Sequence, residues 1–223
     1  FAQRVTPALA TQAAVEGDED VRRELVRGIG RSELPQWAPV LREYAADPCE
    51  WVRLVVAQDL AGLFGGDDPD EVSIWTLKGL TRDPEPEVRD WATFSLGTLC
   101  EVDTPAVRAA LRARLDDTAE DTTAAHAAVG LAARHDSVVL PHLRRWLLAP
   151  ADVVGNLVVE AAGLLGDPTL LPRLRELKAG GWADHDPLPG MIDDAIELLE
   201  AADEVGPGAS SKGPGCSSQG PGC

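Results

Sequence analysis

Apolar and polar residues along the chain follow a helical period, and the pattern repeats. Three segments share a form in which a Val-Arg pair follows acidic residues and opens an amphipathic stretch. They are DEDVRRELVRGIG from Asp18, CEWVRLVVAQDLAGLFG from Cys49 and EPEVRDWATFSLGTLC from Glu85. Apolar residues three and four positions apart predict one buried face on an α-helix in each segment.

Two weaker copies continue the series toward the C-terminus. DTTAAHAAVGLAA places Thr123 where the first three have valine, and DVVGNLVVEAAGLLG places Val154 there. The intervals between these equivalent positions are 31, 36, 35 and 31 residues, counted from Val21 through Val52 and Val88. A second helical segment precedes each copy after the first, and DPTLLPRLRELKAG with PGMIDDAIELLEAAD forms a terminal pair.

Units of this length, each two helices joined by a short turn, are typical of an α-solenoid. Asp47-Pro48 and Asp83-Pro84 lie at two of the turns, where a proline disfavours helix in the residue before it. We therefore expect an all-α fold, a right-handed α-solenoid of about six helix pairs over residues 1–203. A tail of different composition, residues 204–223, follows it.

The units resemble HEAT repeats, in the short form also called HEAT-like or phycobilisome-lyase-like repeats. The resemblance rests on the three Val-Arg pairs, the Asp-Pro turns and the closing Leu-Gly or Leu-Cys dipeptides. It implies that Arg22, Arg53 and Arg89 each bond an acidic turn residue of a neighbouring repeat. The two later copies lack this arginine, so we expect the C-terminal half to be held by apolar packing alone.

In solenoids of this kind the second helix of each pair lines the concave surface. We expect the helix face opposite the valine position to lie there, and its helical spacing selects a stripe of positions. The partner-binding residues predicted from this stripe are Arg23, Arg27, Leu54, Gln58, Asp90, Phe94, Val129, Asn156 and Glu160.

Most positions of the stripe are apolar or glycine, whereas a solvated face would be mostly charged. This favours a non-catalytic scaffold or adaptor that binds a protein or peptide in a concave groove. The prediction rests mainly on Leu54, Phe94 and Val129. The alternative is that tight curvature buries the stripe against neighbouring repeats, which alanine and glycine would suit equally well.

The charge of the chain narrows the class of partner. The sequence has 37 acidic and 20 basic residues, a formal net charge of −17 over 223 residues. Such a field repels a phosphate backbone, so we expect no nucleic-acid binding, and a basic protein or peptide fits better as a partner. The alternative is that the acidity only keeps the protein in solution. No apolar run is long enough for a membrane span. Cys49 and Cys100 form no disulfide framework, which indicates a reducing cytoplasm.

Residues with the spacing of a catalytic or metal site are missing. His126 lies in an alanine-rich helix as a packed or rim residue, and His135 and His142 are poorly spaced as metal ligands. The acidic segment GGDDPDE, residues 65–71, lacks the pattern of a calcium loop. The six tryptophans are expected to be core anchors. We therefore predict no enzyme activity, no metal and no cofactor; a HEAT-fold lyase or glycosylase-like enzyme is the less favoured reading.

The C-terminal tail contains the units SSKGPGC and SSQGPGC in succession. Its Gly-Pro-Gly and Ser-Ser sequences cannot bury enough surface to fold, which predicts a flexible coil. One interpretation is an added linker or thiol handle, and others are a native low-complexity tail or a thiol–metal site. A further alternative is that the folded body is a leader for a lanthionine-type precursor, whose tail a peptide-modifying enzyme would modify. Its modification residues would be Ser210, Ser211, Cys216, Ser217, Ser218 and Cys223.

Overall fold

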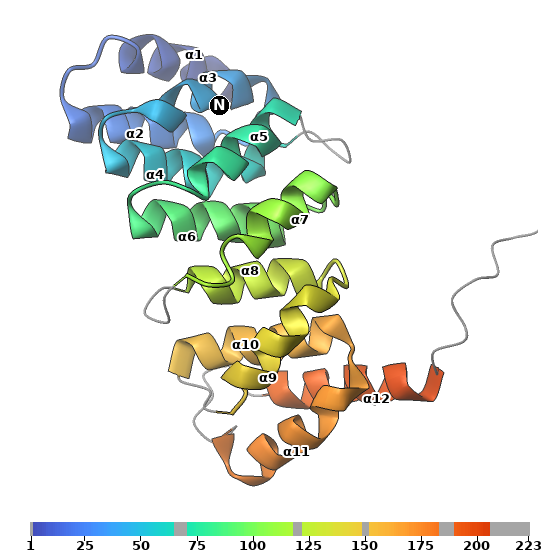
Figure 1. Cartoon of the computed structure of the whole chain (residues 1–223). Coiled ribbons are helices and arrows are strands. Elements are labelled where there is room, and N and C mark those ends of the chain that lie inside the picture. The colour runs from blue at the N-terminus through green and yellow to red at the C-terminus, as the bar shows by residue number, and fades with distance from the viewer. Residues whose placement is uncertain (1, 65–70, 118–121, 149–151, 183–189, 206–223) are drawn as a thin grey trace, which may run out of the picture.

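Twelve α-helices stack as six pairs along a curved axis in the part of the chain that the structure describes (Figure 1). The structure is a computed structural model and describes residues 2–64, 71–117, 122–148, 152–182 and 190–205. Within these residues the chain forms helices and turns but no strand. The prediction of an all-α solenoid of about six helix pairs is therefore confirmed.

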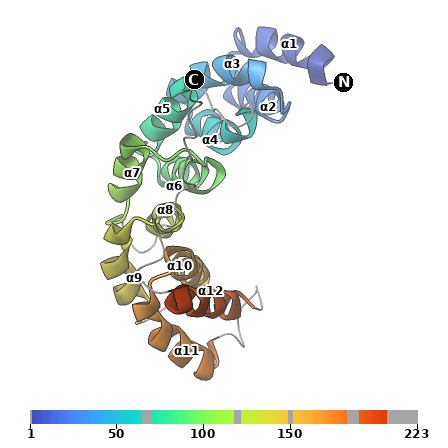
Figure 2. The same cartoon turned by 90° about the vertical axis from the view of Figure 1, so that its right-hand side faces the viewer.

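The first helix of each pair lies on the convex side of the arc and the second on the concave side (Figure 2). The outer helices are α1 (Ala2–Ala13), α3 (Ala38–Glu43), α5 (Glu71–Leu80), α7 (Pro105–Arg112), α9 (Leu140–Trp146) and α11 (Leu171–Ala179). The inner helices are α2 (Glu19–Gly30), α4 (Glu50–Asp59), α6 (Pro86–Phe94), α8 (Thr123–Ala132), α10 (Asp152–Leu165) and α12 (Met191–Val205). Short 3₁₀ segments are η1 (Pro35–Trp37), η2 (Tyr44–Ala46), η3 (Ala61–Leu63), η5 (Ser137–Val139) and η6 (Pro168–Leu170), and η4 (Ser95–Leu99) is a π turn.

Acidic residues start the inner helices in the way that the sequence predicts. Asp18 caps α2, its Oδ1 accepting the backbone N–H groups of Asp20 and Val21 at 3.0 Å each. Asp47 and Asp83 fold back on their own turns and accept the backbone N–H groups two residues ahead at 2.9 and 3.0 Å. These side chains satisfy donors that the ends of the helices leave free.

An arginine ladder joins the first four pairs of helices. Arg22 donates two hydrogen bonds to the carboxylate of Asp47, in the turn before the next inner helix, at 2.9 and 3.1 Å. Arg53 donates two to the carboxylate of Asp83, in the turn after that, at 2.7 and 2.9 Å. Arg89 lies 3.8 Å from Asp117 in the equivalent place. The expectation that these three arginines bond acidic turn residues of a neighbouring repeat is confirmed.

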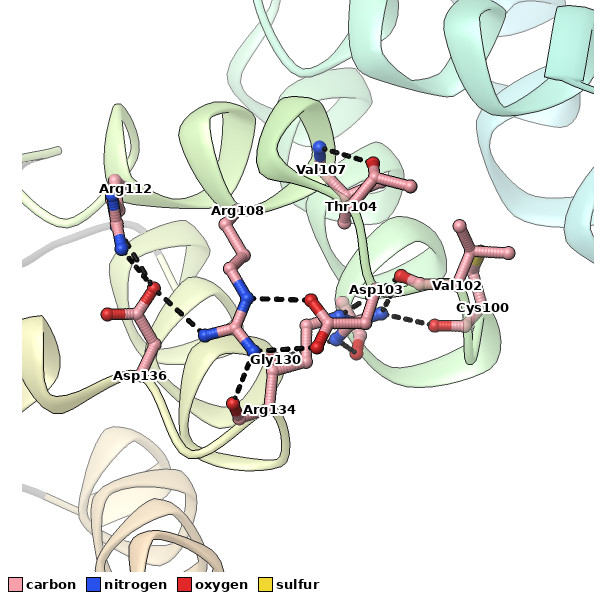
Figure 3. A network of polar contacts seen from close by, with 11 residues as sticks. Cys100, Val102, Asp103, Thr104, Val107, Arg108, Arg112, Gly130, Arg134 and Asp136 are labelled. Atoms are coloured by element: carbon pink, nitrogen blue, oxygen red, sulfur yellow. Dashed lines mark hydrogen bonds and ion pairs between the residues drawn. The ribbon is translucent and has the colours of Figure 1, made fainter.

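The expectation that apolar packing alone holds the C-terminal half is wrong. The carboxylate of Asp136 accepts a hydrogen bond from the guanidinium of Arg112 at 2.6 Å, and it lies 3.4 Å from the guanidinium of Arg108 (Figure 3). Further along, Arg144 donates to the hydroxyl of Thr169 at 2.8 Å, and Arg173 donates to the carbonyl of Leu147 at 2.9 Å. These arginines come from outer helices, whereas the ladder of the first half uses inner helices.

Arg134 stabilises the junction between α6 and α8. It is 8% exposed, and its guanidinium donates to backbone carbonyl groups of η4 and the segment after it. It also donates to the carbonyl groups of Gly97 and Gly130, at 2.7 Å each. A buried charge of this kind is tolerated because several acceptors replace its water shell.

Consecutive inner helices approach one another closely, and small residues make this possible. A Cβ atom on Gly163 of α10 would lie 3.2 Å from the Cβ of Ala195 on α12. All residues of α8 are buried except His126, which is half-buried. The inner helices therefore form a densely packed layer whose remaining exposed strip is the concave surface.

Burial departs from the repeat pattern at Val21 and at two of the tryptophans. Val21 occupies the valine position that is fully buried at Val52, yet it is 46% exposed, because α2 is the first inner helix of the described stack and has no inner helix before it. The expectation that the tryptophans are core anchors holds in part. Trp37, Trp91, Trp146 and Trp182 are half-buried and pack against the core, whereas Trp51 and Trp75 are 46% and 68% exposed. Cys49 and Cys100 are buried free thiols.

The described chain ends with α12 at Val205, two residues beyond the predicted end of the solenoid. The tail that follows, residues 206–223, lies outside the described residues. The predicted modification residues there are Ser210, Ser211, Cys216, Ser217, Ser218 and Cys223, and their role stays a prediction.

Candidate functional site

The structure divides the predicted stripe into half-exposed and buried residues. Leu54 and Val129 are 5% and 3% exposed, so the expectation that they face a groove is wrong. Val129 lies on α8, which packs against α6, α10 and its outer partner α7. Leu54 lies on α4, which packs against α2, α6 and the η2 turn that follows its outer partner. Packing on three sides covers more of a helix than the stripe allowed for. The other seven predicted residues are half-buried: Arg23, Arg27, Gln58, Asp90, Phe94, Asn156 and Glu160.

A row of rings crosses from α6 to α8 at the middle of the solenoid. Trp91 and Phe94 meet edge to face, with ring centroids 5.6 Å apart and an interplanar angle of 89°. The ring of Phe94 lies 5.1 Å from that of His126. All three side chains are half-buried, so the row presents apolar and aromatic edges to solvent.

Beside these rings, Asp90 orients two side chains of the next repeat. Its Oδ1 lies 2.8 Å from Nδ1 of His126, and its Oδ2 accepts the hydroxyl of Thr122 at 2.7 Å. Because Asp90 belongs to α6 and its partners lie at the start of α8, the carboxylate links adjacent repeats. His126, expected as a packed or rim residue, is therefore held at the surface by an acidic neighbour.

Glu160 continues this polar surface on α10. Burial raises the pKa of its carboxyl group, and the charge of His126 partly opposes that rise. Its carboxylate makes no hydrogen bond to another residue that the structure describes. A half-buried carboxylate without a hydrogen-bond donor is well placed to accept a donor from outside the chain.

An open pocket of about 430 Å³ lies next to Glu160, between α10 and α12. We call it the α10–α12 pocket, and its lining residues are Glu160, Gly163, Leu164, Met191, Asp194, Ala195 and Leu198. None of them belongs to α9 or α11, the outer helices of these two pairs, which places the pocket on the concave side. Leu198, at the edge of the pocket, is 53% exposed.

The N-terminal part of the stripe has a different character. Arg23 forms ion pairs with Asp20 and Glu24 of its own helix at 3.0 Å each. Asp59 on α4 is half-buried, and burial raises its pKa while Arg31 and Arg27 oppose the rise. The arginines predicted to bind a partner therefore already have acidic neighbours within the chain.

Sequence reasoning missed Trp91, Thr122 and most of the α10–α12 pocket. Trp91 was assigned to the core with the other tryptophans. The residues of α12 escaped because that helix lacks the Val-Arg signature from which the stripe was counted. The available signal was the helical spacing of Met191, Asp194 and Leu198, which share one face at intervals of three and four residues.

No helix among the described residues is long and apolar enough to cross a membrane. Nor does this part of the chain bring together three or more His, Cys, Asp or Glu side chains in an arrangement that could hold a metal ion.

Comparison with known proteins agrees with the repeat architecture. The chain is 36% identical to protein YibA of Escherichia coli strain K12 over 105 residues, which are 47% of this chain and 36% of that protein. The match thus spans about a third of the length of its curated relative. The X-ray structure of YibA from E. coli superposes with a TM-score of 0.69 at 26% identity, covering 89% of this chain and 69% of that one.

Two more distant structures share the fold. The complex of CpcE and CpcF of phycocyanin lyase from Nostoc gives a TM-score of 0.50 at 16% identity, covering 90% of this chain and 83% of that one. An engineered protein gives 0.59 at 16% identity, covering 90% and 97%. The family model for HEAT repeats matches residues 6–97 and 74–161. The chain therefore belongs to the HEAT-repeat family.

Proposed function

We propose that the protein is a non-catalytic binding module that holds a protein or peptide segment along the concave side of its solenoid. The observation that carries the proposal is the open, mostly apolar α10–α12 pocket, with Leu198 53% exposed at its edge. Exposed apolar groups gathered in a hollow favour association, because contact with a partner removes them from water. The ring row of Trp91, Phe94 and His126 adds a second anchor on the inner helices.

The geometry around His126 supports a binding role over a catalytic one. An aspartate that holds the Nδ1 of a histidine occurs in general-base sites, where the other ring nitrogen activates a nucleophile. Here the nearby hydroxyl, that of Thr122, donates to the same Asp90 at 2.7 Å. The hydroxyl is thus engaged by the carboxylate and serves to position the end of α8.

A peptide-display experiment tests this proposal with a defined probe. A library of random dodecapeptides is panned on the full chain, and enriched peptides are synthesised and titrated by fluorescence anisotropy. We expect binding to weaken about tenfold or more in Phe94→Ser and in Leu198→Ser, because each removes an apolar anchor. Trp75→Ser is the matched control, since this exposed side chain lies on outer helix α5.

Circular dichroism and thermal melting of each variant show whether the fold is retained. The proposal is overturned if no peptide is enriched above a blocked surface. It is equally overturned if the enriched peptides lose affinity in Trp75→Ser and keep it in both concave variants.

A further inference from the structure

We propose that the α10–α12 pocket receives a lysine or arginine side chain of the bound segment. The aliphatic stem would lie on Leu164, Met191 and Leu198. The cationic group would lie between Glu160 and Asp194. This inference deepens the proposed function and rests on it, because it specifies which chemistry in a partner the concave surface selects.

The shape and composition of the pocket match an amphipathic side chain. Leucine and methionine side chains with Gly163 and Ala195 form its floor, and a carboxylate stands on each of the two helices that border it. Lysine and arginine bury their methylene stems on apolar surfaces while the charged head stays at a polar rim. A purely apolar side chain would fill the floor but leave Glu160 without a donor.

The acidic residues around α12 differ in whether the chain itself neutralises them. On the side facing α11, Asp193 pairs with Lys178 at 2.6 Å and Glu200 pairs with Arg175 at 2.6 Å. Within the described residues, neither Glu160 nor Asp194 has such an ion pair. Among the described residues, Glu160 and Asp194 at the border of the pocket thus have no cation from the chain, and the same holds for the exposed Glu197 outside the lining.

The histidine nearest to Glu160 does not supply the missing partner. His126 of α8 bonds Asp90 through Nδ1 at 2.8 Å, and it acts on Glu160 only through its charge. The chain as a whole carries a formal charge of −17, which attracts cationic segments and speeds their encounter. Local and overall charge therefore favour the same kind of partner.

Small arginine derivatives test the pocket directly in the full-length protein. Nα-acetylarginine amide is titrated into ¹⁵N-labelled protein and followed by two-dimensional NMR. Its uncharged isostere, Nα-acetylcitrulline amide, is the reference probe. We expect millimolar affinity for one side chain and shifts centred on the amides of Gly163, Leu164 and Leu198, with the citrulline probe bound about fivefold or more weakly.

Three variants remove one charge each and separate the pocket from general electrostatics. Glu160→Gln and Asp194→Asn should each weaken the arginine probe about threefold to tenfold. Glu197→Gln is the control, because it removes the same charge from an exposed position of α12 outside the lining. It should leave the affinity within about twofold.

The pH dependence of binding gives a second readout. A bound cation favours the ionised form of Glu160, whose pKa burial raises in the free protein. Affinity should therefore rise as the pH is increased from about 4.3, the ordinary value for glutamate, and level off once the group is ionised. His126 and Asp194 also face this region, so Glu160→Gln identifies the contribution of Glu160 by flattening the profile.

The inference is overturned if the citrulline probe binds as well as the arginine probe, or if the shifts fall outside α10 and α12. It is also overturned if Lys212→Gln changes the chemical shifts of the amide groups that line the pocket before any probe is added. A cation from the chain's own tail would then be the occupant. Peptides that bind the concave surface but do not enrich arginine or lysine would refute this inference alone. Probe binding in the absence of any enriched peptide would refute the proposed function alone.

Discussion

A Cβ atom on Gly130 would lie 2.6 Å from the Cα of Gly97. The two glycines bring α8 against the π turn η4 backbone to backbone, at the point where Arg134 binds both of their carbonyl groups. At Gly130 no side chain larger than hydrogen fits unless the helices separate.

Gly130→Ala should therefore destabilise the protein by about 1–3 kcal/mol, because the added methyl group overpacks a rigid contact. Urea unfolding followed by circular dichroism measures the change. Gly79→Ala is the control, since a Cβ on this residue of α5 meets no atom within 4 Å. The control should be neutral or more stable by up to about 1 kcal/mol, and equal losses in the two variants would contradict the packing argument.

Arg134→Met should cost about 3 kcal/mol or more, because it leaves several buried carbonyl oxygens without a donor. Arg134→Lys keeps the charge but has fewer donors and the wrong shape, so its stability should be intermediate. Hydrogen exchange should show the loss of protection concentrated in α6, η4 and α8. A uniform loss along the solenoid would show that Arg134 does not act at this junction.

The ion pair of Arg53 with Asp83 predicts a pH-dependent stability. Burial disfavours the charge of Asp83, yet the hydrogen bonds from Arg53 and from the backbone of Glu85 lower its pKa. A carboxyl group whose pKa is lower in the folded state stabilises that state above its unfolded pKa of about 3.9, and the contribution is lost as the pH falls through the folded value.

Asp83→Asn should thus cost about 2 kcal/mol at pH 7 and much less at pH 3, as measured by urea titration at both values. The amide can still accept the bond from Glu85, so the turn is retained. Asp116→Asn removes the same charge at an exposed site and should change stability by less than about 0.5 kcal/mol. A penalty for Asp83→Asn that is independent of pH would exclude the ionised pair as its cause.

The buried and half-exposed members of the predicted stripe should respond differently to truncation. Leu54→Ala should cost about 2–4 kcal/mol, because it leaves a cavity in the layer of inner helices. Phe94→Ala should cost less than about 1.5 kcal/mol, since part of its ring already faces water. Thermal melting with equilibrium unfolding measures both, and a larger loss for Phe94→Ala would place the ring in the core.

The repeat architecture and the first arginine ladder could be predicted because their signals are local and periodic. The acidic turn and the Val-Arg pair recur in one register, which located Arg22 and Arg53, and the resemblance to HEAT repeats implied that each bonds an acidic turn residue of a neighbouring repeat. The pairing of Asp136 could not be found in this way. Its arginines, Arg108 and Arg112, lie on outer helix α7, away from the register that the pattern follows.

The concave surface was predictable only in part, for a geometric reason. Helical spacing shows which residues share a face, but not how closely the next helix approaches that face. Close approach at small residues buried Leu54 and Val129, whereas Phe94 and Glu160 stayed half-exposed. The sequence allowed both outcomes, and the separation of the inner helices decided between them.

The ladder also bears on how a chain of this kind can change its length. Arg53 reaches forward to the turn of the following repeat, and Asp47 in its own turn accepts Arg22 of the preceding one. A stretch excised between equivalent points of α2 and α4 would carry away one arginine and one aspartate together, leaving the flanking partners able to join. Duplication of the same stretch would add one of each. Unequal recombination could thus lengthen or shorten the arc by whole repeats without stranding a buried charge.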